Sequence, residues 1–213
     1  MFKNAGLQIR FFSAFMFIGL IVFAVAFLGW STNQELSKYI NILSTNSLPS
    51  VIGLWKVNEG QTQIESSERA LLNVELTKTE RRAEIARIQN AWNQINEGYK
   101  KYDATPRTNE EEKLYDQIKI KWAEWKKNHE KYLQMNQEFE GLGILNPKQR
   151  LLDLTIQGKK PDSPEILAAK KAKGFLDQLS QQAKDNRPSF EAATASLLQD
   201  IAYNEQFGLN AAQ

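Results

Sequence analysis

A row of polar residues interrupts the apolar face of the first long helix expected in this sequence. The row passes through Asn58, Thr62, Ser66 and Arg69 at spacings of three and four, between apolar positions that would face a core. Polar side chains on a core-facing stripe are costly unless they are paired. A site for a small polar ligand is one reason to keep them. We therefore predict ligand contact by Arg69, with Thr62, Ser66 and Asn73 as polar neighbours.

Two other interpretations of this row stay open. Glu65 and Arg69 lie four residues apart, the spacing of an ordinary surface ion pair, which is worth a few tenths of a kcal/mol. The row would also suit a seam between two copies of the chain. Arg81 and Arg82 lie near the same end of the expected fold and are weaker candidates for ligand contact.

No catalytic, cofactor or metal constellation accompanies the row, so we expect no enzyme, no cofactor and no metal site. The 213 residues include no cysteine, one histidine and no Gly-rich phosphate loop. That histidine, His129, is expected in the core among aromatic residues, although its ordinary pKa near 6.5 leaves a pH-sensing role open. The 27 Lys and Arg nearly balance the 25 Asp and Glu, which argues against a nucleic-acid partner.

The segment at 11–30 predicts a transmembrane helix. Seventeen of its twenty residues are apolar, enough to span a hydrocarbon core of ~30 Å. Lys3 and Arg10 precede it, so the positive-inside rule places 1–10 in the cytoplasm and 31–213 outside it, in the periplasm of a bacterial cell. The alternative is a cleaved signal peptide, because Ala24-Val25-Ala26 has the form of a cleavage site.

The rest of the chain predicts an all-α fold, an antiparallel up-down-up-down four-helix bundle after the transmembrane helix. Apolar spacing and capping residues place the helices at about 31–76, 78–103, 109–141 and 164–213, with a further helical segment at 147–157. Pro49 and Pro188 are expected to kink or interrupt their helices. The segment 141–163 is longer than such a bundle needs.

A resemblance follows from the stretch at 46–72, NSLPSVIGLWKVNEGQTQIESSERALL, placed after an N-terminal span and before three more helices. The chain resembles the four-helix-bundle sensor domain of methyl-accepting chemotaxis proteins. The resemblance implies a homodimer that binds small ligands across its two bundles and shifts its last helix along the membrane normal. Family members often place an arginine near Arg69 to hold a ligand carboxylate, and the planar guanidinium suits that task.

We therefore expect the sensory input module of a bacterial chemoreceptor in the inner membrane. Its expected partners are a small solute such as a carboxylate or an amino acid, or a periplasmic binding protein. The resemblance also implies a second span and a cytoplasmic signalling domain after Gln213. The alternatives are the sensor half of a histidine kinase, which carries the same domain, and a membrane-anchored helical adaptor that binds a protein.

Overall fold

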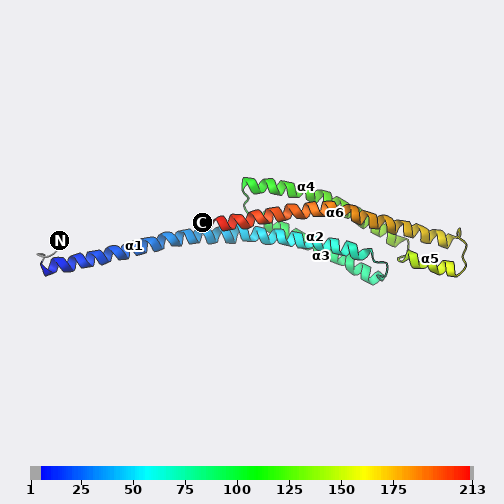
Figure 1. Ribbon diagram of the computed structural model, residues 1–213, viewed down its shortest axis with the longest axis horizontal. Coiled ribbons are helices and arrows are strands. Elements are labelled where there is room, and N and C mark those ends of the chain that lie inside the picture. The colour runs from blue at the N-terminus through cyan, green and yellow to red at the C-terminus, as the bar shows by residue number, and fades with distance from the viewer. Residues whose placement is uncertain (1–5, 212–213) are drawn as a thin grey trace.

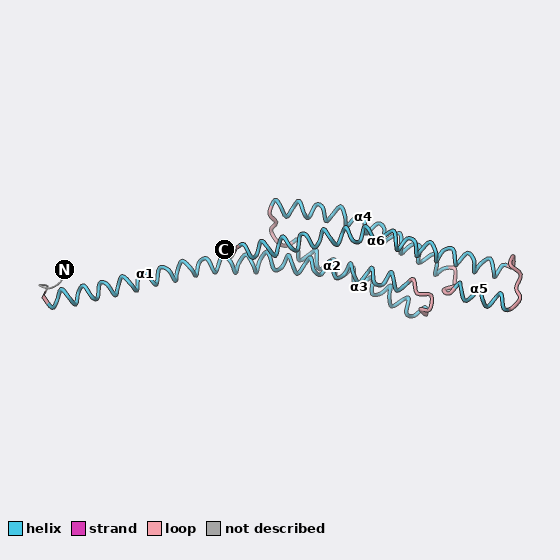
Figure 2. The backbone as a smooth tube through the Cα atoms, viewed as in Figure 1, coloured by secondary structure: helices cyan, strands magenta, loops and turns pink. Residues whose placement is uncertain are grey.

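The chain folds into a bundle of long helices from which one helix projects (Figures 1 and 2). The computed structural model describes residues 6–211, and no strand occurs within that range. The elements are α1 (Leu7–Ile42), the π-helical turn η1 (Leu43–Ser47), α2 (Leu48–Leu71), α3 (Lys78–Asp103), α4 (Asn109–Gly141), α5 (Pro147–Ile156) and α6 (Pro164–Asn210). Helices α2, α3, α4 and α6 alternate in direction, so the predicted up-down-up-down four-helix bundle is confirmed.

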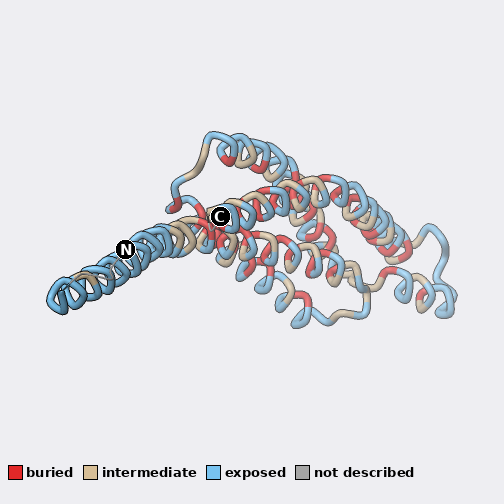
Figure 3. The backbone as a smooth tube through the Cα atoms, turned by 60° about the vertical axis from the view of Figure 1, so that its left-hand side comes forward, coloured by how far each residue is buried: buried red, intermediate tan, exposed pale blue. Residues whose placement is uncertain are grey.

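Helices α1 and α2 form one continuous rod through η1. The rod runs from Leu7 to Leu71, 65 residues, and is ~100 Å long at 1.5 Å per residue. Its first half projects from the bundle and buries none of its side chains (Figure 3). Within residues 6–211 it is the one helix long and apolar enough to cross a membrane.

Pro49 does not break this rod, although we expected a kink or a new helix there. Proline has no N–H, and its ring crowds the carbonyl group of the residue four positions earlier. The chain adopts the wider π-helical turn η1 immediately before Pro49, and such a turn gives the ring more room. The hydroxyl of Thr45 donates to the carbonyl oxygen of Asn41 at 2.7 Å, which satisfies one acceptor at the start of the turn.

Two further differences from the expected helices occur. The rod ends at Leu71 rather than near residue 76, because Asn73 forms a turn in which its Oδ1 accepts from the main-chain N–H of Glu75 at 3.0 Å. Helix α6 continues through Pro188 rather than splitting there. Pro188 lies on the exposed side of α6, where water can reach the carbonyl group left without its usual donor.

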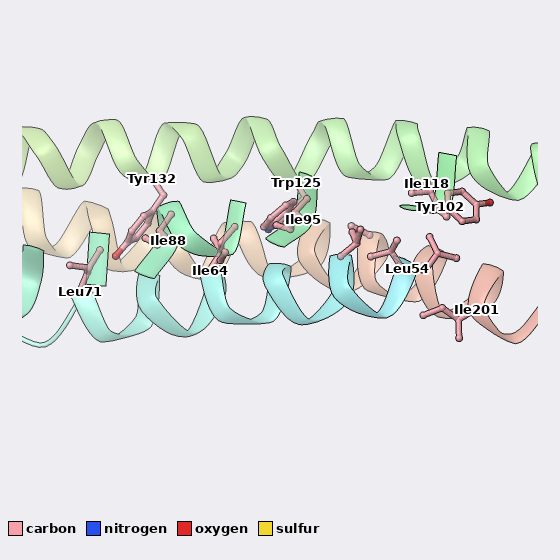
Figure 4. Close-up of a cluster of buried hydrophobic side chains, with 14 of the residues drawn as sticks. Leu54, Ile64, Leu71, Ile88, Ile95, Tyr102, Ile118, Trp125, Tyr132 and Ile201 are labelled. Carbon is pink, nitrogen blue, oxygen red and sulfur yellow. The ribbon is translucent and has the colours of Figure 1, made fainter. Parts of the chain in front are cut away.

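The core is built from side chains that recur every seven residues, the spacing of a coiled-coil seam. Figure 4 shows these side chains meeting between the four helices. The fully or nearly buried set is Val57, Ile64 and Leu71 on α2, Ile88, Ile95 and Tyr102 on α3, and Ile118, Trp125, Tyr132 and Phe139 on α4. Leu179, Leu197 and Ile201 complete it from α6.

The bundle consists of two close helix pairs, α2 with α3 and α4 with α6. Three glycines, Gly53, Gly60 and Gly98, bring α2 and α3 together. A Cβ on Gly98 would lie 2.6 Å from the carbonyl oxygen of Gly53, closer than real Cβ atoms come to other atoms. The pair can therefore pack this closely only with glycine at these positions.

At the end of the bundle away from α1, α4 and α6 reach past the turn between α2 and α3 (Figure 1). The extra helix α5 packs against α6 there and forms a small second core from Leu154, Ile166 and Ala169. The long segment at 141–163 is thus largely this helix with its two turns. Gly143 and Gly158 adopt φ angles of 72° and 71° in those turns, where glycine is favoured.

Candidate functional site

A groove on the outer face of α2 contains part of the predicted polar row. Its volume is about 650 Å³, and Arg87 of α3 closes one side. Its lining mixes an apolar end, polar groups and charges. The lining residues are Ile52, Trp55, Lys56, Asn58, Glu59, Thr62, Gln63, Ser66 and Arg87.

The structure brings only two of the four predicted site residues into this groove. Thr62 and Ser66 line it, and the Thr62 hydroxyl donates to the carbonyl oxygen of Asn58 at 2.9 Å. Arg69 lies outside the lining and forms an exposed ion pair with Glu65, as in the surface-pair interpretation. Asn73 belongs to the turn after α2. Ligand contact by Arg69 stays a prediction.

Sequence reasoning missed the cations of the groove. Arg87 is held loosely, 3.8 Å from Glu84, and its side chain is half exposed. Lys56 pairs with Glu97 at 3.1 Å. No local signal marks Arg87, because it comes from another helix and reaches the groove only when α3 packs on α2.

A second polar site lies inside the bundle, where the sequence predicted a mostly apolar core. Glu68 on α2 and His129 on α4 are almost fully buried, and their Oε1 and Nδ1 atoms are 2.7 Å apart. The indole N–H of Trp92 on α3 donates to Nε2 of His129 at 3.2 Å. The hydroxyl of Tyr132 donates to the carbonyl oxygen of Glu68 at 2.6 Å. Three helices are thus joined by one hydrogen-bond chain.

A buried arginine joins the same helices one layer further from α1. Arg81, which is 1% exposed, donates to Glu140 at 2.7 Å, to Asn136 at 2.6 Å and to the carbonyl oxygen of Leu71 at 2.7 Å. Its guanidinium also lies 5.6 Å from the centre of the Phe139 ring. Arg81 therefore caps the end of α2 and is not free to bind a ligand.

A third polar cluster lies near the end of the bundle from which α1 projects. The Tyr102 hydroxyl donates to Asp200 Oδ2 at 2.8 Å, and Asn204 Nδ2 donates to Asp200 Oδ1 at 2.9 Å and to Glu111 Oε1 at 3.0 Å. Burial raises the pKa of Asp200 to about 6, and the nearby Glu111 adds to the rise, against the hydrogen bonds from Tyr102 and Asn204. Asp200 therefore keeps its proton to a higher pH than an unfolded aspartate does.

Glu111 departs from the role its sequence suggests. A capping box at Thr108 would turn the Glu111 side chain back to the start of α4. The Thr108 hydroxyl does accept from the Glu111 main-chain N–H at 3.1 Å, but the Glu111 carboxylate points into the bundle and meets Asn204. The corresponding box at Thr77 and Glu80 is complete.

The raised pKa of Asp200 predicts a pH-dependent effect of Asp200→Asn. The folded state holds a proton that an unfolded Asp releases near pH 4, so this contribution to stability is full below about pH 4 and is lost as the pH rises through about 6. Relative to the native chain, the free energy of unfolding of the variant should therefore rise by about 2 kcal/mol between pH 4 and pH 7.

Denaturant unfolding of the two chains at several pH values would measure this difference. Asp162→Asn, at an exposed loop position, is the matched control and should show no such trend. A constant difference between Asp200→Asn and the native chain from pH 4 to pH 7 would contradict the proton assignment.

A family model described as a four helix bundle sensory module for signal transduction matches residues 4–139. The match takes in the rod, α3 and nearly all of α4, and it includes the α2 groove and the Glu68–His129 pair. No curated protein and no solved structure matches the chain.

Proposed function

Because this chain belongs to the family of four-helix-bundle sensory modules for signal transduction, we propose that it binds a small solute in the α2 groove and passes a helix displacement across a membrane. The receiving part would be a cytoplasmic signalling domain, as in a chemoreceptor. We place the bundle in the periplasm of a bacterial cell, anchored by α1 in the inner membrane. The basic residues Lys3 and Arg10 ahead of the apolar segment support that orientation.

The observation that carries this proposal is the continuity of the rod. The groove lies on α2, and the apolar segment lies on α1, and both belong to one uninterrupted helix. No loop lies between them to absorb a displacement. A shift or rotation of α2 caused by a bound solute would therefore reach the membrane segment.

The groove suits a small carboxylate or an amino acid. Arg87 and Lys56 supply positive charge, and Thr62 and Ser66 supply hydroxyl groups beside it. Asn58 Oδ1 is buried and has no hydrogen-bond partner within the described part of the chain, so a ligand amino group could reach it only after the Asn58 side chain turns toward the groove. Trp55 and Ile52 offer apolar contact at the other end.

A second copy of the chain would close the open side of the groove. Trp55 and Ile52, which both line the groove, remain 45% and 37% exposed in one copy. We therefore propose a homodimer in which the α2 faces meet. Arg69, on the same helix, would then lie near the interface, where its guanidinium could contact a ligand bound in the groove of the partner.

Binding by the full chain in lipid nanodiscs tests the proposal. The probes are single amino acids, dicarboxylates, aromatic acids and inorganic anions, each titrated by calorimetry. Arg87→Ala should weaken binding of a carboxylate about 10- to 100-fold, because a hydrogen bond to a charged group contributes about 1.5–3 kcal/mol. Arg82→Ala is the matched control, an exposed arginine of α3 outside the groove.

Comparing Arg69→Ala with Arg87→Ala distinguishes two positions for the ligand. Loss of binding in Arg69→Ala but not in Arg87→Ala would move the ligand to the dimer face near Arg69. Equal binding in both variants would reject the groove as a carboxylate site. If no probe binds, the exposed Trp55 and Ile52 favour the second candidate function, a helical adaptor whose α2 face binds a protein.

A further inference from the structure

The hydrogen-bond chain through His129 determines where its proton lies. An indole N–H can donate but not accept, so Nε2 of His129 must carry no proton to accept from Trp92. The proton of the neutral imidazole is then on Nδ1, which donates it to the carboxylate of Glu68 at 2.7 Å. In this state all three groups have compatible partners, and Glu68 and His129 together hold one net negative charge.

The surroundings leave that charge uncompensated. Within residues 6–211 no lysine or arginine forms an ion pair with Glu68. Burial raises the pKa of Glu68, and the hydrogen bond from His129 opposes the rise. The groups that face the pair from the four helices are Glu65 on α2, Trp92 on α3, Trp125 and Tyr132 on α4 and Asn186 on α6. One cation lies close to the site, because Nζ of Lys126 is 5.5 Å from the centre of the Trp92 ring.

We propose that Glu68, His129 and Trp92 form a proton-binding site and that the bundle senses external pH in addition to its solute. A proton from solvent adds to Nε2 of His129, the more basic of the two titratable side chains by type. The imidazolium then faces the Glu68 carboxylate, and the buried charges cancel. Both ring nitrogens now donate, so the hydrogen bond from Trp92 must break.

Trp92 is placed to convert that break into a movement. Its ring lies between α3 and α4, 5.6 Å from Trp125 and 6.2 Å from Trp122 by ring centres. It also lines a groove of about 420 Å³ between α3 and α4, beside Ile88 and Leu133, which gives the ring space to move.

Trp92 is connected to the membrane segment through one helix contact and one continuous helix. Trp92 belongs to α3, which packs closely on α2 through the glycine contacts, and α2 continues into α1. Protonation would therefore act on the same rod as the solute. This last step rests on the proposed sensory function, whereas the proton site itself does not.

The chain has one histidine, so ¹⁵N NMR of the histidine-labelled full chain in nanodiscs reports on His129 alone. At pH 8 we expect a protonated Nδ1 and a bare Nε2. As the pH is lowered, both nitrogens should become protonated, and the Trp92 indole signal of a tryptophan-labelled sample should change with the same midpoint. A proton on Nε2 at pH 8, or a neutral ring throughout, would overturn the proposal.

Two variants test the coupling. Trp92→Phe removes the hydrogen bond that protonation must break, so the midpoint should rise by about half to one pH unit. Glu68→Gln removes the counter-charge, so the midpoint should fall by more than one pH unit. The matched controls are Trp30→Phe and Glu124→Gln, two changes at exposed positions outside the bundle core and the α2 groove that should leave the midpoint unchanged.

If Glu68→Gln does not fold, Trp92→Phe decides alone, because its smaller side chain keeps the core apolar. An unchanged midpoint in Trp92→Phe, or titration of His129 without any change in the Trp92 signal, contradicts the proposed coupling. Solute binding is measured separately. Binding of a solute by a chain whose His129 never titrates would therefore reject the proton site and leave the proposed function standing.

Discussion

Arg81→Ala is expected to lower the free energy of unfolding by about 3–5 kcal/mol, because two buried acceptors lose their donor at about 1–3 kcal/mol each and the half-buried Glu140 loses its ion pair. The guanidinium holds Glu140 of α4 and the last main-chain carbonyl group of α2 at once. Without it, the Asn136 side chain and the Leu71 carbonyl lose their donor in a site that water does not reach. The ends of α2, α3 and α4 would therefore loosen together.

Denaturant unfolding of the full chain in nanodiscs, followed by circular dichroism, would measure this loss. For a chain of this size it corresponds to a midpoint about 6–20 °C lower in a thermal scan. Arg82→Ala is the matched control, because Arg82 is the next residue of the same helix and is exposed, so its loss should change stability by less than about 0.5 kcal/mol. Similar losses in the two variants would show that the Arg81 contacts contribute little.

Gly98→Ala is expected to destabilise the bundle by about 3 kcal/mol, at the upper end of the cost of overpacking. The added Cβ would lie 2.6 Å from the Gly53 carbonyl oxygen and 2.8 Å from Cγ2 of Val57. Because one of these contacts is with main chain, no change of rotamer can relieve it. Helices α2 and α3 would have to separate where their glycines meet.

Gly174→Ala is a matched control with the opposite expected sign. Gly174 lies within α6, and a Cβ there would meet no atom within 4 Å. Alanine at an exposed helical position should stabilise the chain by roughly 0.5–1 kcal/mol, because glycine costs that much more in a helix. The same unfolding measurement serves both variants. If Gly98→Ala were also stabilising, the close approach of α2 and α3 would be wrong.

Patterns within one helix made most of the fold predictable. The helix starts near residues 78, 147 and 164 were predictable, because the caps that fix them, Thr77, Asn146 and Ser163, each need only one side chain and the N–H group three residues on. Seven-residue apolar spacing predicted the faces of α3 and α4 that meet the core. Family membership was predicted from the order of these helices together with the stretch at 46–72, and the family match over residues 4–139 confirms it.

The prolines and the end of α2 show where local rules fall short. Proline disfavours a helix interior, yet Pro49 and Pro188 both lie within continuous helix. Helix α6 is packed on both sides of Pro188, and that packing offsets the ~3 kcal/mol cost of the proline, whereas α1 before Pro49 buries no side chain and the π-helical turn η1 accommodates the ring instead. A rule applied to a few residues does not include that energy.

The candidate site was predictable only in part. Thr62 and Ser66 were found because they interrupt an apolar row on one helix, and that interruption is visible in the sequence. Arg87 was missed because it reaches the groove from α3. The buried hydrogen bonds among Glu68, His129 and Trp92 were missed because these residues lie far apart in sequence. Glu68 and His129 are separated by 61 positions. Nothing near Glu68 distinguishes it from the exposed glutamates of α2.

The amino-acid sequence by itself therefore determined the membrane-length apolar segment, the number and direction of the helices, and most of their ends. These features depend on residues within a few turns of one another. Only the tertiary structure decided which polar residues face inward, how close α2 lies to α3, and which groups the two ring nitrogens of His129 meet. Those depend on the rotation and register of whole helices, which are set by the summed packing of four helices rather than by any local pattern.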